Sequence, residues 1–328
     1  MMRPPFPAIS PDRRAQMLRP RVGSPVRVVI DSDTANEIDD QFALTWALLR
    51  RDVLTIEAVY AAPYSFRHRL SNPRDGVDAA EGMERSYQEA LTICRIMGVA
   101  VDVYRGSERY LTQSTEPVRS VAATHLVDLA RKASAEDPLY VLAIGAPTNV
   151  ASALLMNPEI IRNIVVVWTA GYPTRCPYPN AAFNLEQDLH ASRLLFDSGV
   201  ALVYLPGFHI GAQLRVSLPE IERWVRGYGE IGDYLYHLYT HNPLHAMKSI
   251  DDHFGRSSVI WDFINVAWLV EPAWVPSSLV RAPHLGDDKR WYRNEERHAI
   301  REALGIDRDA IFRDFFTRLQ AFDGQPTP

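Results

Sequence analysis

The amino-acid sequence predicts an α/β fold, with an open, mainly parallel β-sheet, helices on both faces of that sheet, and a helical cap. Short apolar runs rich in β-branched residues alternate along the chain with segments of helical character. This alternation implies right-handed strand–helix–strand crossovers, which cover both faces of a parallel sheet. The chain has 328 residues, 47% of them hydrophobic, so it can bury a large core.

Each element of this fold has its own signal in the sequence. The apolar runs predicted as strands are, in chain order, Val26–Ile30, Val53–Ala61, Val101–Tyr104, Leu139–Ile144, Ile164–Trp168 and Ala201–Leu205. The segments predicted as helices are Phe42–Leu49, Glu84–Met97, Val118–Ala135, Asn149–Met156, Leu189–Ser198, Asp262–Val270 and Arg308–Phe322. The helical, loop-rich stretch from about Arg215 to Ser257 is expected to cap one edge of the sheet.

The sequence predicts one domain preceded by a short extension. No repeat, low-complexity tract or linker divides the chain after its first 25 residues. We therefore expect residues 1–25 to form an N-terminal extension and residues 26–328 a single α/β domain. Within the extension, Ser10 is expected to cap a helix whose first residue is Pro11.

Composition excludes several classes of protein. The net charge is −5 and no stripe of Lys and Arg occurs, which argues against nucleic-acid binding. No apolar run is long enough to span a membrane, and the N-terminus lacks the apolar stretch of a signal peptide, so a cytoplasmic protein is expected. The two cysteines, Cys94 and Cys176, are too few for a disulfide framework.

The most informative segment is the acidic loop Asp31–Asp40, which follows the first predicted strand. Five carboxylates fall within these ten residues, and ligands of parallel sheets bind at the carboxyl ends of the strands. Carboxylates that converge repel one another, so a hard cation bound by oxygen, Ca²⁺ or Mg²⁺, would compensate them. Asp39 and Asp40 also lie at the start of the following helix. Acidic residues there interact favourably with the helix dipole, and this needs no metal. Both interpretations are compatible with the spacing.

Four blocks of sequence, in the same order, resemble the inosine-uridine-preferring nucleoside hydrolase family. The acidic loop is similar to the family's Asp-Thr-Asp-Pro-Gly-x-Asp-Asp signature, with two additional residues. The other blocks are Gly145–Ala151, similar to Gly-x-Leu-Thr-Asn-Ile-Ala, then Ala182–Asn184 with Asp188, and finally Val259–Asp262. The resemblance covers about residues 26–270 and implies a nucleoside-hydrolase-like, Rossmann-like sheet.

The resemblance implies a role for each matching residue. It implies that Asp33, Asp40, Asp262 and the main-chain carbonyl of Ile144 bind Ca²⁺, with Mg²⁺ the weaker alternative. It also implies that Asp33 is the general base, that Asp39 and Asn184 bind the ribose hydroxyls, and that Asp31 supports the loop from behind. A small ribosyl compound is the expected substrate, and the family suggests a homodimer or homotetramer.

The chain departs from the family on the side of the leaving group. Trp261 replaces a histidine that precedes the last aspartate, and tryptophan has no titratable proton to give. It could stack on an aromatic leaving group or simply pack in the core. Other candidates are Asn180 as a donor to the sugar, and His209 or the histidines between His237 and His253 as proton donors. The cluster of basic residues around Arg67 and Arg85 leaves a phosphorylated substrate possible.

Three functions therefore compete. The first is a Ca²⁺-dependent hydrolase in which Asp33 activates a metal-bound water to cleave the N-ribosyl bond of a nucleoside or related compound. The second is a hydrolase of another glycosidic substrate, because the residues facing the leaving group differ. The third is a non-catalytic, Ca²⁺-dependent protein that binds ribose-like ligands.

Overall fold

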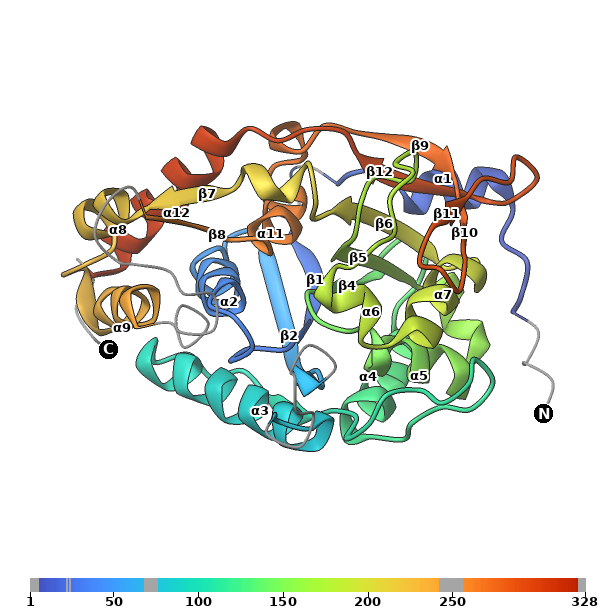
Figure 1. Cartoon of the computed structure of the whole chain (residues 1–328), viewed down its shortest axis with the longest axis horizontal. Coiled ribbons are helices and arrows are strands. Elements are labelled where there is room, and N and C mark those ends of the chain that lie inside the picture. Colours follow the sequence, from blue (N-terminus) through green and yellow to red (C-terminus); the bar gives the residue numbers. More distant parts are fainter. Residues whose placement is uncertain (1–5, 22, 24, 68–75, 242–255, 324–328) are drawn as a thin grey trace.

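A computed structural model describes residues 6–21, 23, 25–67, 76–241 and 256–323 of the chain. Its centre is an eight-stranded sheet in the order β3-β2-β1-β4-β5-β6-β12-β9 (Figure 1). The strands of this sheet are β1 (Val26–Ser32), β2 (Leu54–Ala61), β3 (Val103–Arg105), β4 (Leu139–Ala143), β5 (Ile164–Ala170), β6 (Ala201–Pro206), β9 (Ser277–Arg281) and β12 (Ala299–Ala303). The strands predicted from the sequence are therefore confirmed, and β9 and β12 are additions to them.

All neighbouring strands of the large sheet run parallel except β9, which pairs antiparallel with β12. Strand order reverses beside β1, which lies between β2 and β4. Asp31 is paired with Tyr60 of β2 and with Ala143 of β4. A ligand crevice is expected where the strand order of a parallel sheet reverses, outside the carboxyl ends of the strands. The acidic loop after β1 begins at this point.

Helices cover both faces of the sheet. One face packs against α2 (Asp39–Leu49), α3 (Ala79–Ile96), α8 (Leu218–Trp224), α9 (Gly229–Thr240), α11 (Phe263–Val270) and α12 (Arg308–Asp323). The other packs against α4 (Val121–Lys132), α5 (Thr148–Met156) and α7 (Leu189–Asp197). Alternate residues of β1 enter the two cores, Val28 and Ile30 one of them and Val29 the other. Both faces of the strand are buried, which explains its continuous apolar sequence.

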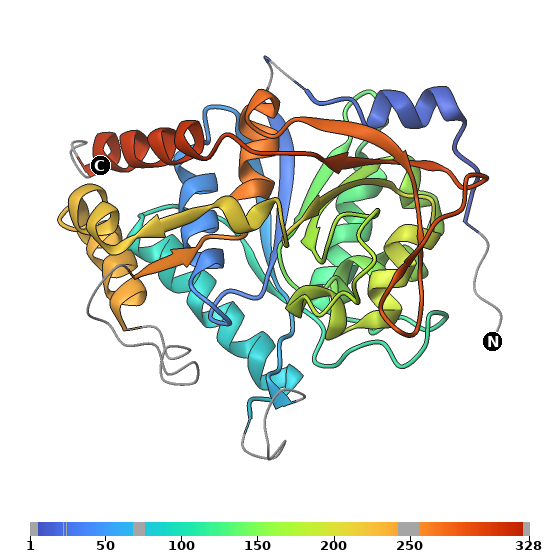
Figure 2. The same cartoon turned by 45° about the horizontal axis from the view of Figure 1, so that its top comes forward.

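The remaining elements lie around this frame. They are α6 (Phe183–Glu186), the 3₁₀ helices η3 (Pro158–Arg162), η4 (Gly211–Gln213) and η5 (Pro272–Trp274), and two small antiparallel pairs, β7 (Arg215–Ser217) with β8 (Ser257–Val259) and β10 (His284–Leu285) with β11 (Trp291–Tyr292). Figures 1 and 2 show α8, α9 and α12 gathered at one end of the molecule and α1 (Pro11–Met17) at the other. The stretch predicted as a cap thus supplies α8 and α9.

The N-terminal helix is capped as predicted and is held against the body. Ser10 caps α1 by accepting a hydrogen bond from the main-chain N–H of Arg13. The Arg14 guanidinium donates to the carbonyl of Val200, and that of Arg301 on β12 donates to the carbonyl of Leu18. In the described part of the chain, no helix combines the length and the apolarity that crossing a membrane requires. Cys94 and Cys176 are both unpaired and buried.

Candidate active site

A cavity of about 230 Å³ lies at the carboxyl ends of β1, β4 and β5. Its walls come from the acidic loop, the first turn of α2, the end of β5, the segment that enters α6, and the residues before α11. The lining residues are Asp33, Asn36, Glu37, Asp39, Asp40, Ile144, Thr169–Gly171, Ala181–Asn184, Gly207, Phe208, Trp261 and Asp262. Segments far apart in sequence therefore meet where the strand order reverses.

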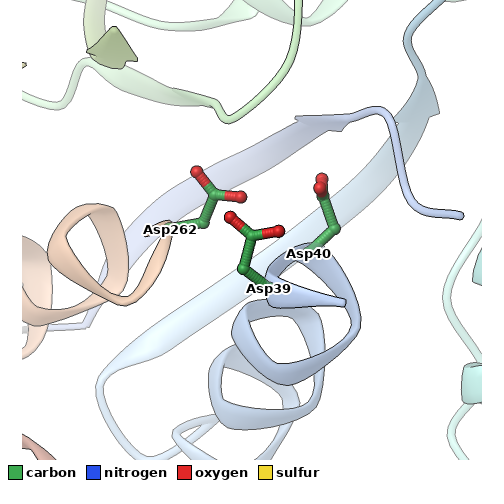
Figure 3. Close-up of side chains that lie close together, drawn as sticks. All are labelled: Asp39, Asp40 and Asp262. Carbon is green, nitrogen blue, oxygen red and sulfur yellow. The ribbon is translucent and has the colours of Figure 1, made fainter. Parts of the chain in front are cut away.

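Three buried carboxylates meet at this cavity. Asp39 and Asp40 occupy the first turn of α2, and Asp262 is the residue that precedes α11. One carboxylate oxygen of each lies within 4.8 Å of the others. Figure 3 shows the carboxylates of Asp39 and Asp262 turned toward one another, with Asp40 beside them. The early acidic loop and the late aspartate are thus brought together. The group contains Asp39, which was expected at the ribose hydroxyls, and does not contain Asp33, which was expected among the cation ligands.

Short side chains of the acidic loop hold the carboxylates in place. The hydroxyl of Ser32 donates to Oδ1 of Asp40 at 2.5 Å. The amide of Asn36 donates to Oδ2 of Asp33 at 3.0 Å. The other oxygen of Asp33, Oδ1, is buried and has no hydrogen-bond partner, and the same is true of Oδ1 of Asp262. Both unpartnered oxygens belong to residues that line the cavity.

The electrostatics of these carboxylates favour a bound cation. Burial raises the pKa of Asp33, Asp39, Asp40 and Asp262 well above the ordinary value, and repulsion between their charges raises each further. Unpartnered buried carboxylate oxygens cost free energy unless a donor or a cation satisfies them. A donor set made only of oxygen atoms suits a hard divalent cation. The residues present therefore fit such an ion.

Asp31 lies behind this group, at the end of β1. It is fully buried, and the amide of Asn149 donates to its Oδ1 at 2.8 Å. Burial raises the pKa of Asp31 to about 7, although the hydrogen bond from Asn149 opposes the shift. Asn149 is itself fixed by Ser107, whose main-chain N–H donates to Oδ1 of Asn149 at 2.7 Å. Asp31 does not line the cavity, which agrees with a supporting position.

Ile144 and Asn184 lie side by side in the cavity wall. The amide of Asn184 donates to the carbonyl of Ile144 at 2.8 Å and to that of Thr169 at 3.3 Å. These bonds tie the start of α6 to the ends of β4 and β5. Ile144 lines the same cavity as the carboxylates, and its carbonyl accepts the hydrogen bond from the amide of Asn184.

A second part of the cavity lining, called the aromatic wall below, consists of aromatic rings. Trp261 meets Phe208 edge to face, with ring centroids 6.0 Å apart and planes at 79°. Phe183 is stacked on Phe66, with centroids 4.6 Å apart and planes at 26°. Trp261, Phe208 and Phe183 all line the cavity. Trp261 thus stands at the cavity and not in the core.

Asn180 does not reach the cavity. It is fully buried, its Oδ1 accepts from the main-chain N–H of Tyr172 at 2.6 Å, and its Nδ2 donates to the carbonyl of Lys289 at 2.8 Å. Both ends of its amide therefore bind the main chain, and Asn180 fastens the loop after β5 to the β10–β11 hairpin. We do not retain it as a substrate-binding residue.

The other side chains considered for the leaving-group side also lie elsewhere. His209 is exposed and does not line the cavity. His237 on α9 stacks on His241, the residue after the helix, with ring centroids 4.3 Å apart. His245 and His253 fall outside the described residues. Of the basic residues after β2, Arg67 and Arg85 do not line the cavity: Arg67 pairs with Asp78 at 3.5 Å and Arg85 pairs with Glu81 at 2.6 Å. Residues 68–75 fall outside the described residues.

Sequence reasoning missed Asn36 and Phe208. Asn36 stands three residues after Asp33, a spacing from which a short amide can reach back to the carboxylate, and this signal was available. Phe208 follows β6 in a segment with no motif, and only the fold brings it to Trp261.

Comparison with known proteins agrees with this geometry. The sequence profile of a family described as inosine-uridine preferring nucleoside hydrolase matches residues 28–313. A non-specific ribonucleoside hydrolase, RihC, of Shigella flexneri serotype 5b (strain 8401) is 31% identical over 147 residues. That match covers 42% of this chain and 43% of the relative, so it spans less than half of either protein.

Solved structures share the fold over most of the chain. A purine-preferring ribonucleoside hydrolase from Gardnerella vaginalis has a TM-score of 0.71 at 20% identity and covers 90% of this chain and 99% of its own. An inosine-uridine preferring nucleoside hydrolase from Bacillus anthracis has a TM-score of 0.63 at 17% identity with the same coverage. At these identities the likeness shows a common α/β fold.

Proposed function

Because the chain belongs to the inosine-uridine preferring nucleoside hydrolase family, we propose that it hydrolyses the N-glycosidic bond of a ribosyl compound in the cavity beside β1. One observation carries the proposal: Asp39, Asp40 and Asp262 bring carboxylate oxygens within 4.8 Å of one another, and Asp33 lines the same cavity. An oxocarbenium-like transition state needs negative charge beside the sugar ring, and this wall supplies it.

We assign a divalent cation to this wall, Ca²⁺ in preference to Mg²⁺. Asp33, Asp40, Asp262 and the carbonyl of Ile144 would hold it. Asp33 and Asp262 each have one unpartnered carboxylate oxygen, one oxygen of Asp40 lies within 4.8 Å of one of Asp262, and Ile144 lines the same cavity. When bound, such an ion supplies Lewis acidity, which binds vicinal hydroxyls and lowers the pKa of water. The donor set, made only of oxygen atoms, supports a hard ion.

The side chains of the chain itself divide the remaining work. Asp33, held by Asn36 through one oxygen, has its other oxygen available to take a proton from the attacking water as that water adds to C1′. Asp39 and Asn184, which both line the cavity, would bind the hydroxyls of the ribose. Trp261, on the aromatic wall, would face the leaving group.

Release of free ribose tests the proposal directly. Inosine and uridine are incubated with the protein in 1 mM CaCl₂, and reducing sugar is measured against Asp33→Asn and against Asp309→Asn, a substitution on the remote helix α12. We expect turnover by the wild type and by Asp309→Asn, and loss of about 10³-fold in Asp33→Asn. Equal turnover by Asp33→Asn would refute the role given to Asp33.

The same assay separates the competing functions. Ribose binding without turnover of any riboside would favour the non-catalytic protein, and cleavage only of an O-glycoside would favour another glycosidase. The expectation of a homodimer or homotetramer stays a prediction, which the molar mass from light scattering tests.

A further inference from the structure

The charge of the cavity is one-sided. Five of its lining residues carry carboxyl groups, namely Asp33, Glu37, Asp39, Asp40 and Asp262. Within the described ranges of the chain, the lining contains no lysine, arginine or histidine. A divalent ion would compensate only part of this charge. The cavity therefore attracts cations and repels anions such as phosphorylated ligands.

Among the described residues, the aromatic wall, which would face the leaving group, contains no side chain suited to act as a general acid. A neutral base departs from C1′ with an extra electron pair, so it needs a proton from a general acid. The Trp261 indole has no titratable proton, and the hydroxyl of Thr169 already donates to Oδ1 of Asn265. Among the residues that the structure describes, the carboxyl groups of the lining all belong to residues 33–40 and to Asp262, and four of the five were assigned above to the cation, the water or the sugar.

The same wall is suited to a flat, positively charged ring. Trp261 and Phe208 meet edge to face, and Phe183 is supported from behind by Phe66. Aromatic faces attract cations, and they do so more strongly when water is excluded. An acidic cavity with aromatic rings therefore favours a cationic heterocycle over a neutral one.

From these three observations we propose that the leaving group is a cationic nitrogen heterocycle, so that the substrate is an N-ribosylpyridinium. The inference rests on the hydrolase function proposed above. The C1′–N bond breaks and its electron pair neutralises the ring nitrogen, so the heterocycle leaves as a neutral molecule and needs no proton. The oxygen of water forms the new bond to C1′, and Asp33 takes one proton of that water. The products are ribose, the neutral pyridine and one proton.

Two ribosides that differ in charge provide the test. The riboside of pyridine-3-carboxamide is a cation, and the riboside of its 1,4-dihydro form is neutral and of nearly equal size. Ribose release from both, and from inosine and uridine, is measured with the rate without enzyme subtracted. We expect kcat/KM for the cation to exceed that for each neutral riboside by about 100-fold, the usual contribution of a general acid.

Binding gives a second measurement that is independent of turnover. Asp33→Asn is titrated with the cationic and the dihydro riboside by calorimetry, in the presence of CaCl₂. We expect the cation to bind about tenfold more tightly, from cation–π attraction and the negative field of the cavity. Equal affinity for the two ribosides would contradict the inference.

Glu37→Gln tests the field of the cavity. Glu37 lines the cavity but is outside the cation ligands assigned above, and Glu108→Gln, an exposed position away from the cavity, is the matched control. We expect Glu37→Gln to raise KM for the cationic riboside about threefold with kcat unchanged, and Glu108→Gln to change neither. A large fall in kcat for neutral nucleosides in Glu37→Gln would identify Glu37 as a general acid and overturn the inference.

The outcomes for the two proposals are distinguishable. If kcat/KM for inosine or uridine equals that for the cationic riboside, the inference is wrong and the hydrolase function stands. If no riboside releases ribose, both are wrong.

Discussion

The two walls of the cavity are built differently. The carboxylate wall comes from the end of a buried strand and the starts of two helices, and Ser32 and Asn36 hold its acidic groups by hydrogen bonds. The aromatic wall comes from two loops and the start of α6, and it packs by ring contacts, such as Trp261 against Phe208. The acidic residues of the first wall match the family's motifs, and Trp261 in the second departs from them. This difference supports our proposal that the sugar-binding part of the site is kept while the leaving group differs.

The largest effect is expected on the carboxylate wall. Asp262→Asn removes one charge from the group formed with Asp39 and Asp40, and we expect kcat/KM for any accepted riboside to fall about 10³-fold. Circular dichroism checks that the variant is folded. Activity within tenfold of the wild type would show that Asp262 is not needed, and the two walls would then differ less than we argue.

The second largest effect is expected on thermal stability, when the proposed cation is removed. The buried carboxylates repel one another, so a cation that binds only the folded protein stabilises it by about 2.7 kcal/mol at a concentration of 100 times its Kd. We expect Tm to fall by several degrees in EDTA and to recover with CaCl₂. Asp262→Asn should respond much less to CaCl₂, and an equal response would place the cation elsewhere.

Trp261→Ala should act on the aromatic wall alone. We expect kcat/KM for the preferred riboside to fall about tenfold through loss of ring contact, with the rise of Tm in CaCl₂ unchanged. Trp261→Phe should recover most of the activity because it keeps an aromatic face. A loss of the CaCl₂ effect in Trp261→Ala would show that the two walls are not independent.

A smaller effect is expected outside both walls, at His298 next to β12. Burial, together with the charges of Arg14 and Arg297, lowers the pKa of His298 from 6.5 to about 3. The unfolded chain therefore binds a proton near pH 6.5 while the folded chain does not, so stability falls as the pH falls from 6.5 toward 3. His298→Gln should reduce the loss of Tm between pH 6.5 and 4.5 and leave kcat/KM at pH 7 unchanged. An unaltered pH dependence of Tm would contradict this assignment.

The parallel core could be predicted because its signals are local. In β1, Val28–Ile30 is apolar on both faces, and the acidic segment that begins at Asp31 marks the end of the strand. Strands β9 and β12 lack such a signal, because Ser277–Arg281 and Ala299–Ala303 mix polar and apolar residues. Several of their side chains are only partly buried. Their pairing joins segments that only the finished sheet brings together.

Within the site, residues that belong to a family motif could be predicted, and residues without one could not. Asp40 and Asp262 were implied by the resemblance of their segments to the family, and they lie at the starts of α2 and α11. Asn180 was expected at the substrate because its loop borders the cavity, yet its side chain turns to the main chain of Tyr172 and Lys289. The direction of a loop side chain depends on partners that are distant in sequence, here the β10–β11 hairpin.

The distance in sequence between Asp40 and Asp262 affects how the protein is made. A nascent chain that has emerged from the ribosome only as far as β6 carries Asp39 and Asp40 but lacks their late partner. The group of three oxygens can assemble only when α11 docks beside α2. The cation could therefore bind only after α11 has been synthesised and has folded. A chain that terminates before α11 would be unable to form the group.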